Sequence, residues 1–221
     1  MGKEVGYFYK KSLDKEPIRI DMEEISQVKV DNRESIISRV SISIENQPPE
    51  IMILKSQNEI SQKFPECTPE YMFKKYLKLK ELGLPVLTDF WVDPENRRFL
   101  MTDLSEWVID KHTKDKLPIV IENLNALKSE AIKFSSIAYQ GNVYLAGEAY
   151  CIFFDKKNYK GKGRLYTLDF GYGSIIFDQH KDIAVEGFNE NYAKYEAKIF
   201  GNWISDHTLN LNSTMSSGCI I

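Results

Sequence analysis

The sequence lacks features typical of secreted, membrane and metal-binding proteins, namely many cysteines or histidines and long apolar segments. Among its 221 residues there are only three cysteines and three histidines. Cys67, Cys151 and Cys219 lie far apart, which argues against a cysteine-rich zinc site and suits a reducing compartment. No run of about 18 apolar residues occurs, so the sequence predicts no membrane span. With no apolar leader among the first residues either, we expect a cytoplasmic protein.

The sequence also lacks a strong charge of either sign. Its 29 lysines and arginines and 32 aspartates and glutamates leave a formal net charge of -3. A nucleic-acid partner is therefore not expected. The hydrophobic content of 43% and charged content of 28% are ordinary for a globular protein, and the length allows one sizeable domain or two small lobes.

The first third of the chain is patterned for strands. Residues 18–30 contain enough β-branched residues to predict one or two strands. In residues 35–45, successive side chains alternate between the two faces expected of a strand. Prolines in residues 46–49 interrupt the pattern, because proline has no N–H for a sheet. Residues 50–55 predict a third strand that ends in Lys55. The simplest expectation is a meander of three antiparallel strands.

The next segment predicts a helix and a hairpin. Thr68 can cap a helix, Pro69 suits its first turn, Glu70 favours the positive end of the helix dipole, and Gly83 ends it. Two further strands are expected at residues 88–92 and 98–104, joined by a turn at residues 93–96.

From Leu117 onward the period becomes helical. A single apolar stripe predicts a long core helix there; its members are Val120, Leu124, Leu127, Ala131 and Phe134. Residues 137–147 look irregular, and residues 149–154 and 164–168 predict a strand pair. A last helix is expected over residues 189–205, with Tyr192, Tyr195, Ile199 and Trp203 pointing inward.

The second strand of that pair runs into Asp169-Phe170-Gly171. A strand ending in these three residues is the metal-binding element of protein kinases. The order of strands, lysine-ending strand, helix, hairpin, long helix, loop and hairpin also resembles a compact member of the protein-kinase-like superfamily, from about residue 15 to 205. The resemblance implies an α+β bilobal fold. Its N-lobe would cover residues 1–104 as an antiparallel sheet with one helix, and a short, mainly helical C-lobe would cover residues 105–221.

The resemblance assigns roles to six positions. Lys55 would neutralise the phosphates of ATP, and Glu70 would pair with it, although Glu66 or Glu81 could replace Glu70. Met101 would back the adenine pocket, and Asp103 and Leu104 would belong to the hinge that reads the adenine edge. Asp169 would bind Mg²⁺, and we expect Lys55 and Glu70 on the same side as Asp169.

The sequence departs from the kinase pattern in three places. The turn at residues 31–35 has no glycine, although glycines let the backbone approach phosphates closely. Residues 137–143 match the catalytic loop, and there Asn142 takes the place of the catalytic aspartate. An amide cannot accept the substrate's proton at neutral pH. Cys151 lies near the place of the metal-binding asparagine, and Glu148 is the one carboxylate in that loop that could substitute for the missing base.

These residues leave three hypotheses. The first is a pseudokinase-type module that binds nucleotide or acts as a scaffold for a protein partner, with no nucleic acid or membrane involved. The alternative is an active atypical kinase or phosphotransferase that uses ATP, Mg²⁺, Lys55 and Asp169. In the third, the resemblance is accidental: Lys55 is a solvated strand end, Glu70 a helix-start acid and Asp169 a turn former.

Overall fold

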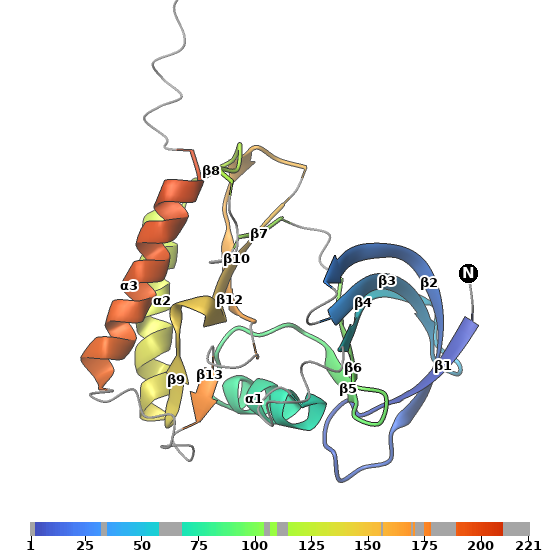
Figure 1. The fold of residues 1–221 in the computed structure, drawn as a ribbon. Helices are drawn as coiled ribbons and strands as arrows, with labels where there is room; N and C mark the ends of the chain where they lie inside the picture. Colours follow the sequence, from blue (N-terminus) through green and yellow to red (C-terminus); the bar gives the residue numbers. More distant parts are fainter. Residues whose placement is uncertain are drawn as a thin grey trace, which may run out of the picture. The chain divides into compact units, whose positions relative to one another are not determined.

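The computed structural model describes residues 3–31, 35–57, 68–103, 107–109, 115–155, 157–168, 170, 175–177 and 189–209. Over these ranges the chain is α+β, with a curled antiparallel sheet and three α-helices (Figure 1). It divides into two compact units. The first is Met1–Lys78 with Leu87–Leu104, and the second is Leu79–Val86 with Ser105–Ile221. Within the described ranges, no helix is both long and apolar enough to cross a membrane.

The first unit is built on a six-stranded antiparallel sheet with the order β1-β2-β3-β4-β6-β5. The strands are β1 (Lys3–Phe8), β2 (Ile18–Asp31), β3 (Ser35–Ser43), β4 (Glu50–Gln57), β5 (Phe90–Asp93) and β6 (Arg98–Thr102). The two edges of this sheet meet, because Tyr9 pairs with Val92 through backbone N–H···O bonds of 2.8 and 3.1 Å. The sheet therefore curls into a closed barrel.

The barrel is filled by alternate residues of its strands. On β3, Val40 and Ile42 point inward, as the alternation of residues 35–45 predicted, and on β4 Met52 and Leu54 do the same. The inner cluster comprises Phe8, Ile20, Met22, Val40, Ile42, Met52, Leu54, Trp91 and Leu100. All nine are at most 8% exposed, so the interior is a packed core.

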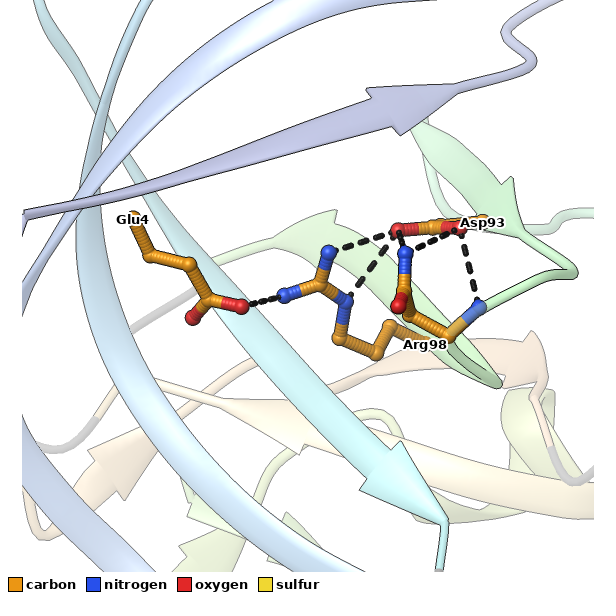
Figure 2. Close-up of polar contacts among 4 residues, drawn as sticks. Glu4, Asp93 and Arg98 are labelled. Carbon is orange, nitrogen blue, oxygen red and sulfur yellow. Dashed lines mark hydrogen bonds and ion pairs between the residues drawn. The ribbon is translucent and has the colours of Figure 1, made fainter.

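One end of the barrel carries a buried ion pair. The Arg98 guanidinium donates to the Asp93 carboxylate from Nη2 (2.7 Å) and Nε (3.2 Å), and its Nη1 pairs with Glu4 of β1 (Figure 2). Asn96, in the turn of the β5–β6 hairpin, donates to the same Asp93 carboxylate. Three strands are tied together at this end.

Helix α1 (Pro69–Glu81) covers part of the outer face of the barrel. Thr68 caps it as predicted, because the Thr68 Oγ1 accepts a hydrogen bond from the backbone N–H of Tyr71 (3.3 Å). Gly83, with φ 70°, follows the helix. The ring of Tyr76 packs on Phe90, which packs on Phe99, with centroids 5.3 and 5.5 Å apart.

In its described residues, the second unit has two long helices and several short strands. Strands β7 (Trp107–Ile109), β10 (Tyr150–Phe154) and β12 (Arg164–Thr167) form a sheet in the order β12-β10-β7. Two smaller pairs are β8 (Val120–Ile121) with β11 (Lys160–Gly161), and β9 (Val143–Leu145) with β13 (Ile175–Phe177). Helices α2 (Leu124–Gln140) and α3 (Glu190–His207) lie against each other.

Two expectations for this unit are wrong. The long helix begins at Leu124, not Leu117, because Val120 and Ile121 are drawn into the β8–β11 pair. Residues 137–147 are not irregular, since α2 continues to Gln140 and β9 follows. Ala138 is fully buried and extends the apolar stripe of α2 by one more turn.

The inward face of α3 also differs from the expected one. Its buried residues are Ala193, Ala197, Phe200, Gly201 and Ile204. Tyr195 is 56% exposed and Ile199 is 36% exposed, so the expectation that they point inward is wrong. Small residues form the contact with α2 instead: a Cβ on Gly201 would lie 2.9 Å from the Lys128 Cγ. Close approach of the two helices favours the small residues over the large ones.

Candidate functional site

Lys55 lies on the outer face of the barrel. Its neighbours Leu54 and Met52 point into the core, so Lys55 and Ile53 point outward. Its cross-strand partners are Ile37 on β3 and Phe99 on β6. Cross-strand partners share a face of the sheet, so Lys55 stands on the face that α1 partly covers. The lysine is half-buried.

Beside Lys55 runs a strip of apolar side chains. Ile53 pairs with Met101 of β6, and Ile37 pairs with Lys55 itself, so all three apolar residues point outward with the lysine. Each of them is half-buried. We call Ile37, Ile53, Lys55 and Met101 the lysine face. It combines three half-buried apolar side chains with one cation, a combination that suits a ring compound carrying an anionic group.

An ion pair borders the lysine face. Arg39, the partner of Ile53 on β3, makes a two-point contact with Asp103, with Nε–Oδ2 at 2.6 Å and Nη2–Oδ1 at 3.4 Å. The Asp103 side chain is only 7% exposed. The Asp103 carboxylate is thus engaged by Arg39. Sequence reasoning missed Arg39, because its partner lies 64 residues away in the chain.

Glu70 lies in the first turn of α1 and is half-buried. In the part of the chain that the structure describes, no ion pair or hydrogen bond joins the Glu70 carboxylate to Lys55. The proposed alternative Glu81, at the last position of α1, is exposed, and Glu66 lies outside the described residues. The lysine–glutamate pair implied by the resemblance is therefore not formed in this structure.

Asn142 stands on a helix-ending turn. The stretch matched to the catalytic loop, residues 137–143, is the last turn of α2, a two-residue turn and the first residue of β9. Asn142 has φ 59°, its backbone N–H donates to the Tyr139 carbonyl (3.0 Å), and its side chain is exposed. Asparagine tolerates this left-handed conformation better than most residues. A local structural reason for asparagine therefore exists at this position.

Glu148 lies in the connection that follows β9. The short 3₁₀ helix η3 (Gly147–Ala149) joins β9 to β10 and carries Glu148, which is half-buried. The backbone N–H of Gly147 donates to the Glu196 Oε2 of α3 (3.0 Å), which fixes this turn against the helix. Sequence reasoning missed Glu196, because the contact spans 49 residues.

Two buried tyrosines, Tyr144 and Tyr150, lie close to this turn in the sequence. Burial, with the Glu196 carboxylate adding to it, raises the pKa of Tyr144 well above its ordinary value. Burial likewise raises the pKa of Tyr150, whose ring packs on Phe200 with centroids 5.3 Å apart. Both phenols therefore stay protonated in the folded protein at neutral pH.

The remaining candidates contribute little to a described site. Cys151 is buried in β10 with its Sγ 3.7 Å from the Tyr166 carbonyl oxygen. Leu104 and Asp169 lie outside the described residues, as do residues 32–34 of the glycine-free turn. Over the ranges that are described, no group of three or more His, Cys, Asp or Glu side chains could hold a metal ion.

Comparison with known proteins gives no family for this chain. No protein-family model matches it, and no curated protein matches it either.

Proposed function

We propose that this protein is a kinase-like, nucleotide-binding module of the pseudokinase type, which acts as a binding or scaffolding protein. The lysine face carries the proposal. An adenine ring would lie on the apolar strip of Ile37, Ile53 and Met101, and Lys55 would contact the phosphates. The lysine-bearing strand β4 is followed by α1 and paired with β6, which agrees with the segment order of the kinase resemblance.

The residues of the lysine face would bind and orient the nucleotide. The apolar strip would exclude water from one side of the base, and the ammonium group would offset the charge of the phosphates. Mg²⁺, which the resemblance assigns to Asp169, would supply further neutralisation of phosphate charge when bound. Among the described residues, no ion pair joins Glu70 to Lys55, so the ammonium group would pair with a phosphate instead.

Thermal melting with ATP and Mg²⁺ tests this proposal. Ligand at about 100 times its Kd stabilises a protein by roughly 2.7 kcal/mol, which corresponds to roughly 5–10 °C for a protein of this size. We expect Lys55→Met to abolish the shift. The matched control is Lys74→Met, which changes an exposed lysine of α1 and should leave the shift intact. Absence of any shift with ATP, ADP or AMP would overturn the proposal.

A second candidate function is phosphoryl transfer, and the position of Glu148 favours it. This carboxylate stands in the β9–β10 connection, whereas Asn142 precedes β9 on a turn that ends α2. A carboxylate there could take the proton of a substrate hydroxyl, so Asn142 need not imply a lost base.

Turnover of labelled ATP separates the two functions. If the protein is active, Glu148→Gln should lower the rate by roughly 10²–10⁴, the usual value of a general base. Glu130→Gln, at an exposed position of α2, is the matched control. Asn142→Asp should change little. A large gain from Asn142→Asp alone would instead identify position 142 as the single defect in the site.

A further inference from the structure

Helix α3 carries a second apolar strip besides the face that packs on α2. The strip consists of Tyr192, Tyr195, Ile199 and Trp203, which follow one another at intervals of three and four residues and so share one side of the helix. Tyr195 is 56% exposed and Ile199 is 36% exposed, whereas Tyr192 and Trp203 are half-buried. We call these four residues the outer strip. Its centre is therefore exposed.

The aromatic rings of the outer strip are held in place by their neighbours. The Tyr195 ring packs on Tyr192 (centroids 6.3 Å apart), and Tyr192 stacks on Tyr144 of β9 (6.1 Å). The Trp203 indole stacks on the His207 ring (4.1 Å), whose Nδ1 lies 2.8 Å from the Trp203 carbonyl oxygen. Even with these contacts, more than half of the Tyr195 surface stays exposed. A partner would therefore contact side chains whose rotamers are already restricted, which lowers the entropy cost of binding.

The outer strip is symmetric about Ile199. Tyr195 and Trp203 lie four residues before and after it, and both are aromatic. Tyr192 and the exposed Asp206 lie seven residues before and after it, and both carry a polar group. A twofold interface needs such a pattern, because each residue lies opposite the one at the same distance on the other side of the axis.

We propose that the outer strip is the interface of a homodimer, in which α3 of one copy packs antiparallel on α3 of the other. Ile199 would lie on the twofold axis, and Tyr195 of each copy would pack on Trp203 of the other. Tyr192 and Asp206 would lie opposite each other at both ends. Apolar side chains thus form the centre of the interface and polar groups form its rim, as in most protein interfaces.

A second copy of the chain fits the outer strip better than a helix of another protein does. A foreign helix needs an apolar face but places no demand on the symmetry of that face, whereas a twofold pair does. Antiparallel packing also places the positive end of one helix dipole beside the negative end of the other. The outer strip shares no residue with the lysine face, so this proposal does not depend on nucleotide binding.

The size of the outer strip predicts a weak dimer. Helix α3 has 18 residues and is therefore about 27 Å long. Four side chains, two of them already half-buried, supply less than the roughly 800 Å² per partner of a standard interface. We therefore expect a dimer Kd on the order of 10–100 μM.

Sedimentation velocity on the full chain, from about 1 to about 300 μM, tests the proposal. We expect the unmodified protein to pass from monomer to dimer over this range. Ile199→Asp should weaken the dimer at least tenfold, because it places two like charges on the twofold axis. The matched control is Ala126→Asp, which adds the same charge at an exposed apolar position of α2 and should leave the dimer intact. Circular dichroism checks that both variants are folded.

Disulfide trapping tests the orientation of the two helices without disrupting the strip by charge. Ile199→Cys should form a linked dimer under mild oxidation, because both copies of residue 199 lie on the axis. Tyr195→Cys should not, because its two copies would lie about 12 Å apart along the helices, too far for a disulfide. The unmodified protein, treated in the same way, gives the background from the native cysteines.

Three results would overturn the proposal. The first is a protein that stays monomeric at about 300 μM, which would leave the outer strip to a helix of another protein. The second is equal weakening of the dimer by Ala126→Asp and Ile199→Asp. The third is cross-linking of Tyr195→Cys as readily as Ile199→Cys, which a parallel pair of helices would give.

Discussion

Arg98 is a charged side chain that is almost completely buried, and this makes it a sensitive point of the barrel. Its side chain is 7% exposed, and the side chain of its partner Asp93 is 2% exposed. Arg98→Met should destabilise the protein by roughly 3–5 kcal/mol, because Asp93 is left buried without its main partner. Urea denaturation measures this loss.

The matched variant is Glu4→Gln. Glu4 pairs with the same guanidinium, but its side chain is 60% exposed, so the change should cost less than about 1 kcal/mol. Equal losses for Arg98→Met and Glu4→Gln would show that Glu4, and not Asp93, is the anion that matters.

Tyr150 gives a pH-dependent prediction at the same scale. Its folded-state pKa is raised by burial, so the unfolded chain ionises this phenol first as pH rises past about 10. Its contribution to stability is complete below that pH and is lost progressively above it. Tyr150→Phe should therefore reduce the fall in melting temperature between about pH 9 and pH 11. An unchanged alkaline slope would contradict the prediction.

Residue-level reasoning from sequence succeeded where the partner lay on a neighbouring strand or turn. Lys55 and Thr68 occupy the strand and the helix cap expected of them. It failed where a contact depends on segments far apart in the chain, as with Arg39 and Asp103. It also misread residues 137–147 as irregular, although α2 continues to Gln140 and Ala138 is fully buried.

At the scale of the element, the packing of α3 on α2 depends on small residues. Ala197 is fully buried, whereas Ile199, two residues away, is 36% exposed. Ala197→Leu should destabilise the protein by roughly 1–3 kcal/mol, because the close helix pair has no room for the larger side chain. Ile199→Ala should cost less than about 1 kcal/mol. Chemical denaturation of both variants tests this, and the reverse order of costs would restore the face expected from sequence.

The elements differed in how well sequence predicted them. Strands β3 and β4 and helix α1 followed from alternation, prolines and capping residues. Strand β1 was not predicted, because its outward Val5 and Tyr7 give it no simple alternation. Strand β8 was read as helix, since two residues carry no period of their own and β11 decides their pairing.

At the scale of the whole molecule, the α+β class and the shared sheet of residues 18–57 with 90–102 could be predicted, but barrel closure could not. Closure depends on the pairing of Tyr9 with Val92, and no local sequence pattern predicts this pairing. Deletion of residues 1–10 should expose the free edges of β2 and β5 and cause self-association, because unpaired edges recruit other strands. Size-exclusion chromatography measures this.

Tyr7→Ser is the control for that deletion. It alters an exposed side chain of β1 and leaves the backbone pairing intact, so it should remain as monodisperse as the unmodified protein. A monodisperse deletion variant would show that closure is not what protects the edges.

The contact of β1 with the β5–β6 hairpin also affects the order in which the chain can fold. Glu4 and Arg98 are 94 residues apart, so the ring of strands cannot close until nearly half of the chain has been synthesised. Pairings between such distant segments slow folding, because loop-closure entropy is lost before the contacts form. Strands β2, β3 and β4 therefore have an unclosed sheet until β6 has been synthesised, and we expect the nascent chain to be most prone to aggregation during that interval.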